Sequence, residues 1–103
     1  MLEYKFDTQL LIEGNDLNEI EIRKYFEKNF DGDSTIIVGT DELIKVHFHT
    51  NEPWEVLKYC ATLGDIYDVV VENMERQANV LWNDLSRVEQ DAYIRRAEGV
   101  KGL

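Results

Sequence analysis

The sequence is poor in cysteine, proline and basic residues, and each scarcity excludes a class of protein. Its 103 residues include one cysteine and one proline, so an internal disulfide and a CxxC pair are both excluded. Only 11 Lys and Arg accompany 21 Asp and Glu, giving a formal net charge of −10. A surface this acidic repels nucleic-acid phosphates and anionic membranes. No apolar run approaches the ~20 residues of a membrane span, and no basic stretch leads into an apolar secretion signal. These absences predict a cytoplasmic protein that binds no nucleic acid.

What is present is an ordinary globular composition with a regular order of elements. Hydrophobic residues make up 44% of the chain and charged residues 31%, which suits one domain with a modest core. Alternating or β-branched runs predict strands, and apolar residues at helical spacing predict helices. The predicted strands cover residues 4–12, 34–39, 43–50 and 66–72, and the predicted helices cover residues 18–30 and 53–63.

This order, βαββαβ, predicts an α+β fold over residues 1–73. Two strand-helix units joined by a hairpin form a ferredoxin-like two-layer sandwich, with one antiparallel sheet and two helices on one face. In that topology the first and third strands are central, antiparallel neighbours. The single cysteine, Cys60, falls on the apolar side of the second helix, which predicts a small core residue.

Residues 74–98 are predicted to form a long C-terminal helix, followed by a frayed tail at residues 99–103. Apolar residues recur in it at heptad spacing. They are Met74, Ala78, Leu81, Leu85, Val88 and Ala92. Such a seam needs a partner, which is either the open face of the chain's own sheet or the same helix of a second copy.

His47 and His49 are the most informative pair for function. On a strand, residues two apart lie on one face, ~6.5 to 7 Å apart, so both imidazoles can reach one ion. Asp7 points to the same face of the first strand, and its position at the beginning of that strand places it beside the end of the third. Asp7, His47 and His49 are therefore predicted to converge. Two imidazoles and a carboxylate suit zinc or another divalent metal.

Acidic residues also crowd the two turns on either side of the second strand. Asp31, Asp33, Asp41 and Glu42 lack the full loop pattern of an EF-hand, so solvated turns are the expectation there.

Four segments, in order, resemble the middle domain of the bacterial fatty acid kinase catalytic subunit, in the dihydroxyacetone-kinase-related, DAK-phosphatase or YloV-type family. The segments are Phe6–Gly14, Gly32–Ser34, Lys45–Pro53 and Val71–Gln77. The resemblance covers about three quarters of the chain. It implies a domain that lies between an ATP-binding kinase domain and a C-terminal domain that engages a DegV-type fatty-acid-binding protein. It also implies a zinc site formed by the two histidines and a cysteine of the first strand.

Asp7 stands where the family has that cysteine, which replaces a soft ligand with a hard one and lowers the expected zinc affinity. Nothing here matches the ATP-binding domain, so we expect an accessory or assembly domain without catalysis of its own. Its expected partners are a DegV-type protein or the kinase domain, and a second copy bound through the C-terminal helix. The alternatives are a small metal-dependent hydrolase, in which Glu13 or Gln9 assists a metal-bound water, and a metal-free dimerisation module.

Overall fold

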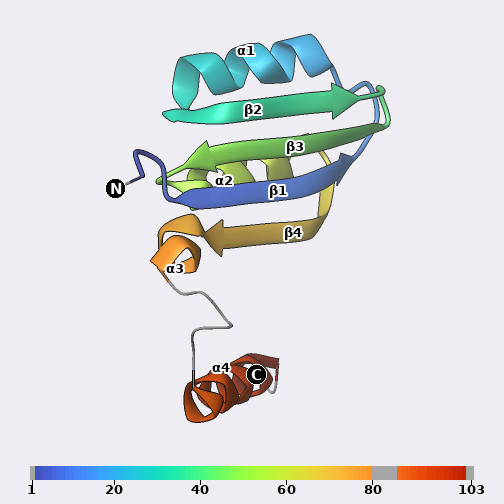
Figure 1. Ribbon diagram of the computed structural model, residues 1–103. Coiled ribbons are helices and arrows are strands. Elements are labelled where there is room, and N and C mark those ends of the chain that lie inside the picture. The colour runs from blue at the N-terminus through green and yellow to red at the C-terminus, as the bar shows by residue number, and fades with distance from the viewer. Residues whose placement is uncertain (1, 80–85, 102–103) are drawn as a thin grey trace.

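The computed structural model describes residues 2–79 and 86–101 as a four-stranded sheet with helices (Figure 1). The strands are β1 (Phe6–Glu13), β2 (Gly32–Gly39), β3 (Leu43–Thr50) and β4 (Asp65–Asn73). The helices are α1 (Glu19–Asn29), α2 (Pro53–Leu63), α3 (Met74–Asn79) and α4 (Arg87–Lys101).

The sheet has the strand order β2-β3-β1-β4, and each neighbouring pair is antiparallel. The predicted α+β class, the antiparallel sheet and the central placing of β1 and β3 are thereby confirmed. The register of the central pair matters most for the site, because it sets Asp7 directly opposite His49 and Gln9 directly opposite His47.

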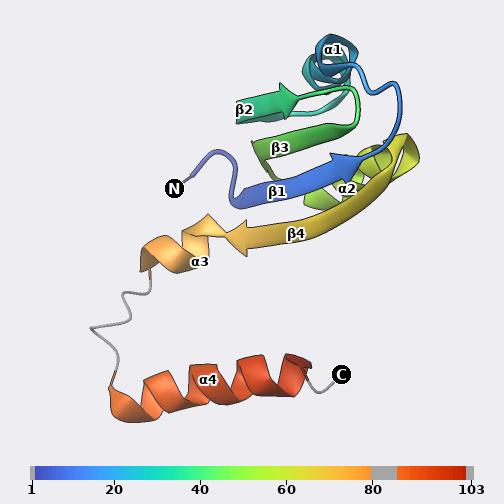
Figure 2. The ribbon, with the colours of Figure 1, turned by 90° about the vertical axis from the view of Figure 1, so that its right-hand side faces the viewer.

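One apolar core fills the space between the sheet and helices α1 and α2. Alternation along β1 and β3 sends every second side chain toward the helices. The buried residues of the strands and both helices form a single cluster: Leu10, Ile12, Ile22, Phe26, Ile37, Ile44, Val46, Phe48, Val56 and Cys60. Both helices therefore cover the same face, as Figure 2 shows, and the opposite face of the sheet is left open.

Local signals begin these helices. The Asn18 side chain accepts hydrogen bonds from the backbone N–H groups of Ile20 and Glu21 at 3.0 and 3.1 Å, which satisfies two donors at the start of α1. Pro53 occupies the first turn of α2, where its missing N–H costs nothing.

Strand β2 begins at Gly32, two residues earlier than predicted. The combination of aspartate and glycine over residues 31–33 favours a turn. Instead Gly32 pairs with Thr50, and the reason is steric. A Cβ at Gly32 would collide with the backbone oxygen of His49 and the ring of Phe48. Only glycine lets the two strands approach this closely.

The continuous helix predicted over residues 74–98 is not what the described residues form. Helix α3 covers Met74–Asn79, α4 begins at Arg87, and Ser86 lies outside both. The reason is a capping box: Glu89 N–H donates to Ser86 Oγ, and Ser86 N–H donates to Glu89 Oε1, both at 3.2 Å. This pair starts a new helix after residue 86.

The predicted heptad seam is only partly visible. Leu81 and Leu85 lie outside the described residues, as does the side chain of Ala78, while Met74 is half-buried and Val88 is 79% exposed. Self-association through this seam stays a prediction, and so do the boundaries at residues 73 and 98. Among residues 2–79 and 86–101, no helix has the length and apolar composition needed to cross a membrane.

The chain enters β1 and leaves β4 at the same end of the sheet. Phe6 pairs with Asn73, and the backbone N–H of Met74 donates to the carbonyl of Lys5 at 2.7 Å. In Figure 1 the N-terminal segment and α3 lie together at this end.

Candidate metal centre

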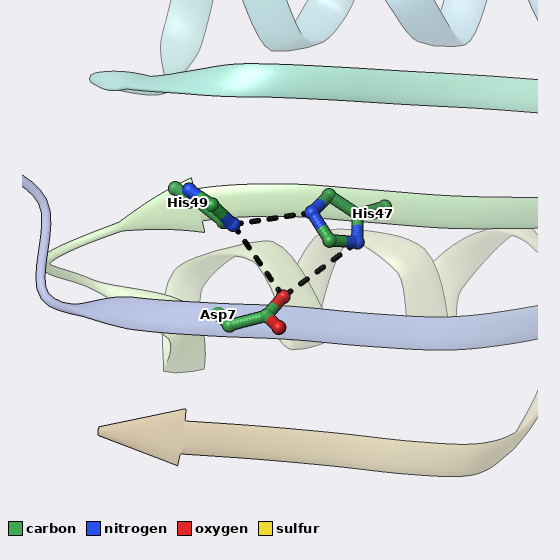
Figure 3. Close-up of side chains that lie close together, drawn as sticks. All are labelled: Asp7, His47 and His49. Carbon is green, nitrogen blue, oxygen red and sulfur yellow. Dashed lines mark hydrogen bonds and ion pairs between the residues drawn. The ribbon is translucent and has the colours of Figure 1, made fainter. Parts of the chain in front are cut away.

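Asp7, His47 and His49 converge on the open face of the sheet, as predicted from the topology. The two histidines come from β3, and Asp7 comes from the facing position of β1 (Figure 3). One ligand atom from each residue can be chosen so that all three atoms lie within 4.8 Å of one another. Convergence of these side chains needs only the alternation of each strand and the antiparallel register between them.

The distances between these side chains fit a shared ion. His47 Nε2 lies 3.1 Å from His49 Nε2. Asp7 Oδ1 lies 3.7 Å from His49 Nε2 and 3.6 Å from His47 Nδ1. Bonds of 2.0–2.2 Å to a tetrahedral metal separate its ligand atoms by roughly 3.3 to 3.5 Å, so small side-chain rotations would bring the three groups onto one ion.

The Asp7 carboxylate supplies the strongest argument for a cation. Its side chain is 15% exposed, and Oδ1 is buried without a hydrogen-bond partner. A buried carboxylate oxygen is normally satisfied by a donor or a cation. The second oxygen, Oδ2, accepts a hydrogen bond from Gln9 Nε2 at 3.1 Å, which leaves Oδ1 facing the histidines. The residues present therefore fit a divalent metal.

The donor set limits which metal fits. Two imidazoles and one carboxylate are ligands for zinc and for other borderline divalent ions, whereas calcium and magnesium prefer oxygen ligands alone. With three protein ligands, a fourth position is left for water or for a group from another molecule.

Asp33 is a neighbour of the site that the sequence did not reveal. Its Oδ1 lies 3.6 Å from His49 Nδ1, and its side chain is 59% exposed. Counting back along the hairpin from the pair Ile36–His47 would place Ser34 opposite His49. An extra residue in β2 places Asp33 there instead. The signal available in the sequence was the short distance of Asp33 from β2, without its register.

Other residues considered from the sequence lie outside the site. Cys60 is fully buried in α2, and burial raises the pKa of its thiol to about 12. The thiol is thus neutral and enclosed. Glu13 pairs with Leu43 at the other end of the central strand pair, so it is remote from the histidines.

A tyrosine-aspartate contact joins the segment before β1 to the residue before β2. Tyr4 donates its hydroxyl to Asp31 Oδ1 at 2.6 Å. This hydrogen bond and the negative charge of Asp31 raise the pKa of Tyr4 to about 12. Nearby, Lys5 N–H donates to Asn51 Oδ1 at 3.0 Å. These contacts help fix the end of the sheet that carries Asp7 and His49.

Comparison with known proteins supports the same region. The chain is 36% identical over 66 residues to an uncharacterised protein of Staphylococcus epidermidis, covering 64% of this chain and 11% of that protein. It is 31% identical over 78 residues to one of Staphylococcus haemolyticus, covering 74% and 14%. It is 39% identical over 46 residues to Protein YloV of Bacillus subtilis, covering 45% and 8%.

The matched segment is thus a small fraction of these relatives, between 8% and 14% of their length. A family model for the FakA-like middle domain of fatty acid kinases matches residues 3–81. That range holds all four strands of the described sheet, both core helices, and the Asp7, His47 and His49 side chains. The chain belongs to the FakA-like middle domain family of fatty acid kinases.

Proposed function

We propose that this chain is a non-catalytic assembly domain of a fatty-acid-kinase-like system and that it binds a divalent metal through Asp7, His47 and His49. The observation that carries the proposal is the buried, unpartnered Asp7 Oδ1 facing two imidazoles. The family supplies the setting, a domain with a ferredoxin-like sandwich inside a multi-domain kinase. Because such a kinase draws on ATP, the proposed location of the domain is the cytoplasm.

The metal's role in this proposal is structural. An ion held by Asp7 from β1 and by His47 and His49 from β3 ties the two central strands together. This occurs at the end of the sheet where the chain enters β1 and leaves β4. A fixed end gives the segments before and after the sheet a defined relative position, which is what an assembly domain needs.

The first test is metal content. Untagged wild-type protein and the variant His47→Ala/His49→Ala would be purified side by side and analysed by mass spectrometry before and after incubation with zinc. We expect about one zinc or other transition metal per chain in the wild type and none in the variant. Lack of metal in the wild type even after incubation would contradict the metal site.

The second test concerns the partner. We propose that the domain supports phosphorylation of fatty acid carried by a DegV-type protein. Titration of a fatty-acid-loaded DegV-type protein with this chain should give saturable binding, measured by calorimetry. Titration with the separate kinase domain of a relative is the other arm. Absence of heat in both arms would leave the assembly role without a direct contact from this domain.

The described geometry favours the assembly role over a metal-dependent hydrolase. Gln9, one candidate to assist a metal-bound water, donates its amide to Asp7. Glu13, the other candidate, lies at the far end of β1. A metal-dependent phosphatase activity that disappears in His49→Ala would nevertheless reverse this preference.

A further inference from the structure

Asp33 contacts the side of the His49 ring that faces away from the proposed metal. Asp33 Oδ1 lies 3.6 Å from His49 Nδ1. The other ring nitrogen, His49 Nε2, lies 3.1 Å from His47 Nε2 and 3.7 Å from Asp7 Oδ1. The two nitrogens of one imidazole therefore have different partners, a carboxylate on one side and the other ligand groups on the opposite side.

Two features of the β2 backbone bring Asp33 to this position. From Asp33 to Ile36 there are three residue steps, but their partners His49 and His47 are only two steps apart. The extra residue is a β-bulge, and Ser34 within it has a φ of 54°, which is uncommon for a residue with a side chain. Bulges re-aim side chains next to functional sites. The bulge exchanges Ser34 for Asp33 opposite His49.

The second feature is Gly32, where the strands touch. A Cβ at this position would collide with the His49 carbonyl oxygen and the Phe48 ring. Gly32 therefore allows the beginning of β2 to lie close against the part of β3 that carries His49. Without this close approach, the neighbouring Asp33 would stand further from the imidazole.

Metal-bound histidines usually donate their second ring N–H to a carboxylate, a backbone carbonyl or water, which fixes both the tautomer and the orientation of the ring. We propose that Asp33 is the positioning residue for His49: it accepts the Nδ1–H and so commits Nε2 to the metal. The inference rests on the metal site proposed above. The 3.6 Å separation exceeds a hydrogen bond. A small rotation of the exposed Asp33 side chain is therefore part of the proposal.

The test compares Asp33→Ala and Asp33→Asn with the wild type, using Zn²⁺ and Co²⁺ alone as probes. Competition with a chelator gives the zinc affinity, and the visible absorption of bound Co²⁺ reports ligand geometry. Asp33→Ala should weaken zinc binding by about tenfold, the lower end of the 10–100-fold effect of such partners, and should alter the cobalt spectrum. Asp33→Asn keeps an oxygen acceptor and should recover most of the affinity and the wild-type spectrum.

The matched control is Asp31→Ala, which removes the same charge two residues earlier, from a carboxylate bound to Tyr4. We expect its zinc affinity to stay within about twofold of the wild type, because a lone exposed charge has a small effect. Thermal unfolding of the metal-free variants identifies any that fail to fold, in which case the Asn variant decides. Unchanged affinity and spectrum in Asp33→Ala would overturn the proposal, and so would equal losses in the Ala and Asn variants. If wild-type protein binds neither ion, the metal site itself fails and this inference fails with it.

Discussion

At the scale of single residues, Asp7 is the departure that most affects chemistry. The resemblance to the family places a cysteine at this position, and here a carboxylate occupies it, 15% exposed and directly opposite His49. A carboxylate keeps the negative charge but is a harder ligand than a thiolate. The residue thus sets which metal the site prefers, while the two histidines set where the metal lies.

Restoring the thiolate should therefore tighten zinc binding. We expect Asp7→Cys to raise zinc affinity by about tenfold or more, because thiolate is a preferred zinc ligand. Chelator competition on the metal-free proteins measures the change. Asp31→Cys is the control, since it adds a thiol near the same end of the sheet without placing it opposite His49. Weaker zinc binding by Asp7→Cys than by the wild type would count against the site.

Cys60 illustrates how burial removes reactivity. Its side chain is fully buried, and this raises the pKa of the thiol from 9.0 to about 12. We expect no alkylation by iodoacetamide in the folded protein at about pH 8 and complete reaction in urea, measured by mass spectrometry. Cys60→Ala/Ala61→Cys moves the thiol to an exposed position of α2 and should react in the folded state. Rapid alkylation of folded wild type would contradict the buried assignment.

The same shift has a pH signature with a definite sign. Below about pH 9 the thiol is protonated in both states, so it adds no pH dependence. Between about pH 9 and pH 12 the unfolded thiol ionises while the folded one stays neutral. The free energy of unfolding should therefore fall as pH rises through this range, and it should fall less in Cys60→Ala. Urea titrations at several pH values measure the difference.

At the scale of elements, short polar motifs decide where helices begin. Asn18 caps α1 through two backbone N–H groups. We expect Asn18→Ala to lower the free energy of unfolding by about 1 kcal/mol, measured by urea denaturation. Asn15→Ala, at an exposed asparagine in the preceding loop, is the control and should change little. Equal effects of the two variants would mean that capping is not the cause.

The fold was predictable where each element carries its own pattern. Alternation in β1 and β3, together with the order of the elements, sufficed to place β1 beside β3 and to bring Asp7 to His47 and His49. No long-range information was needed, because strand periodicity and antiparallel pairing are local rules applied twice.

The bulges were not predictable, because they depend on tertiary pairing. Ser34 and Asp68 adopt positive φ values of 54° and 50°, although neither is a glycine. Both lie where a strand gains one residue on its neighbour. The contact of Asp33 with His49 depends on one of these bulges. The break at Ser86 was missed for a different reason, since the heptad spacing drew attention away from the Ser86–Glu89 capping box.

At the scale of the whole molecule, the metal should couple to stability, because it joins strands that separate on unfolding. Binding to the folded state alone adds ~2.7 kcal/mol when free metal is about 100-fold above its Kd. For a domain of this size that raises Tm by on the order of 10 °C. We expect this rise in wild-type protein titrated with zinc, measured by differential scanning calorimetry.

The corresponding variants separate specific from general effects. His47→Ala/His49→Ala should show no zinc-dependent rise in Tm, whereas Asp41→Ala, which removes a charge from the opposite end of the β2–β3 hairpin, should respond like the wild type. A rise of equal size in the double variant would assign the stabilisation to metal bound elsewhere on this acidic chain.

The hydrogen bond between Met74 N–H and the Lys5 carbonyl has a practical consequence for protein engineering. Residues 5 and 74 bracket the whole sheet and its two core helices, yet their backbones are in direct contact. A segment with adjoining ends can be grafted into a surface loop of an unrelated host without stretching either protein. The sheet should therefore serve as a removable cassette, and a host carrying it would gain a strand pair whose stiffness responds to added zinc.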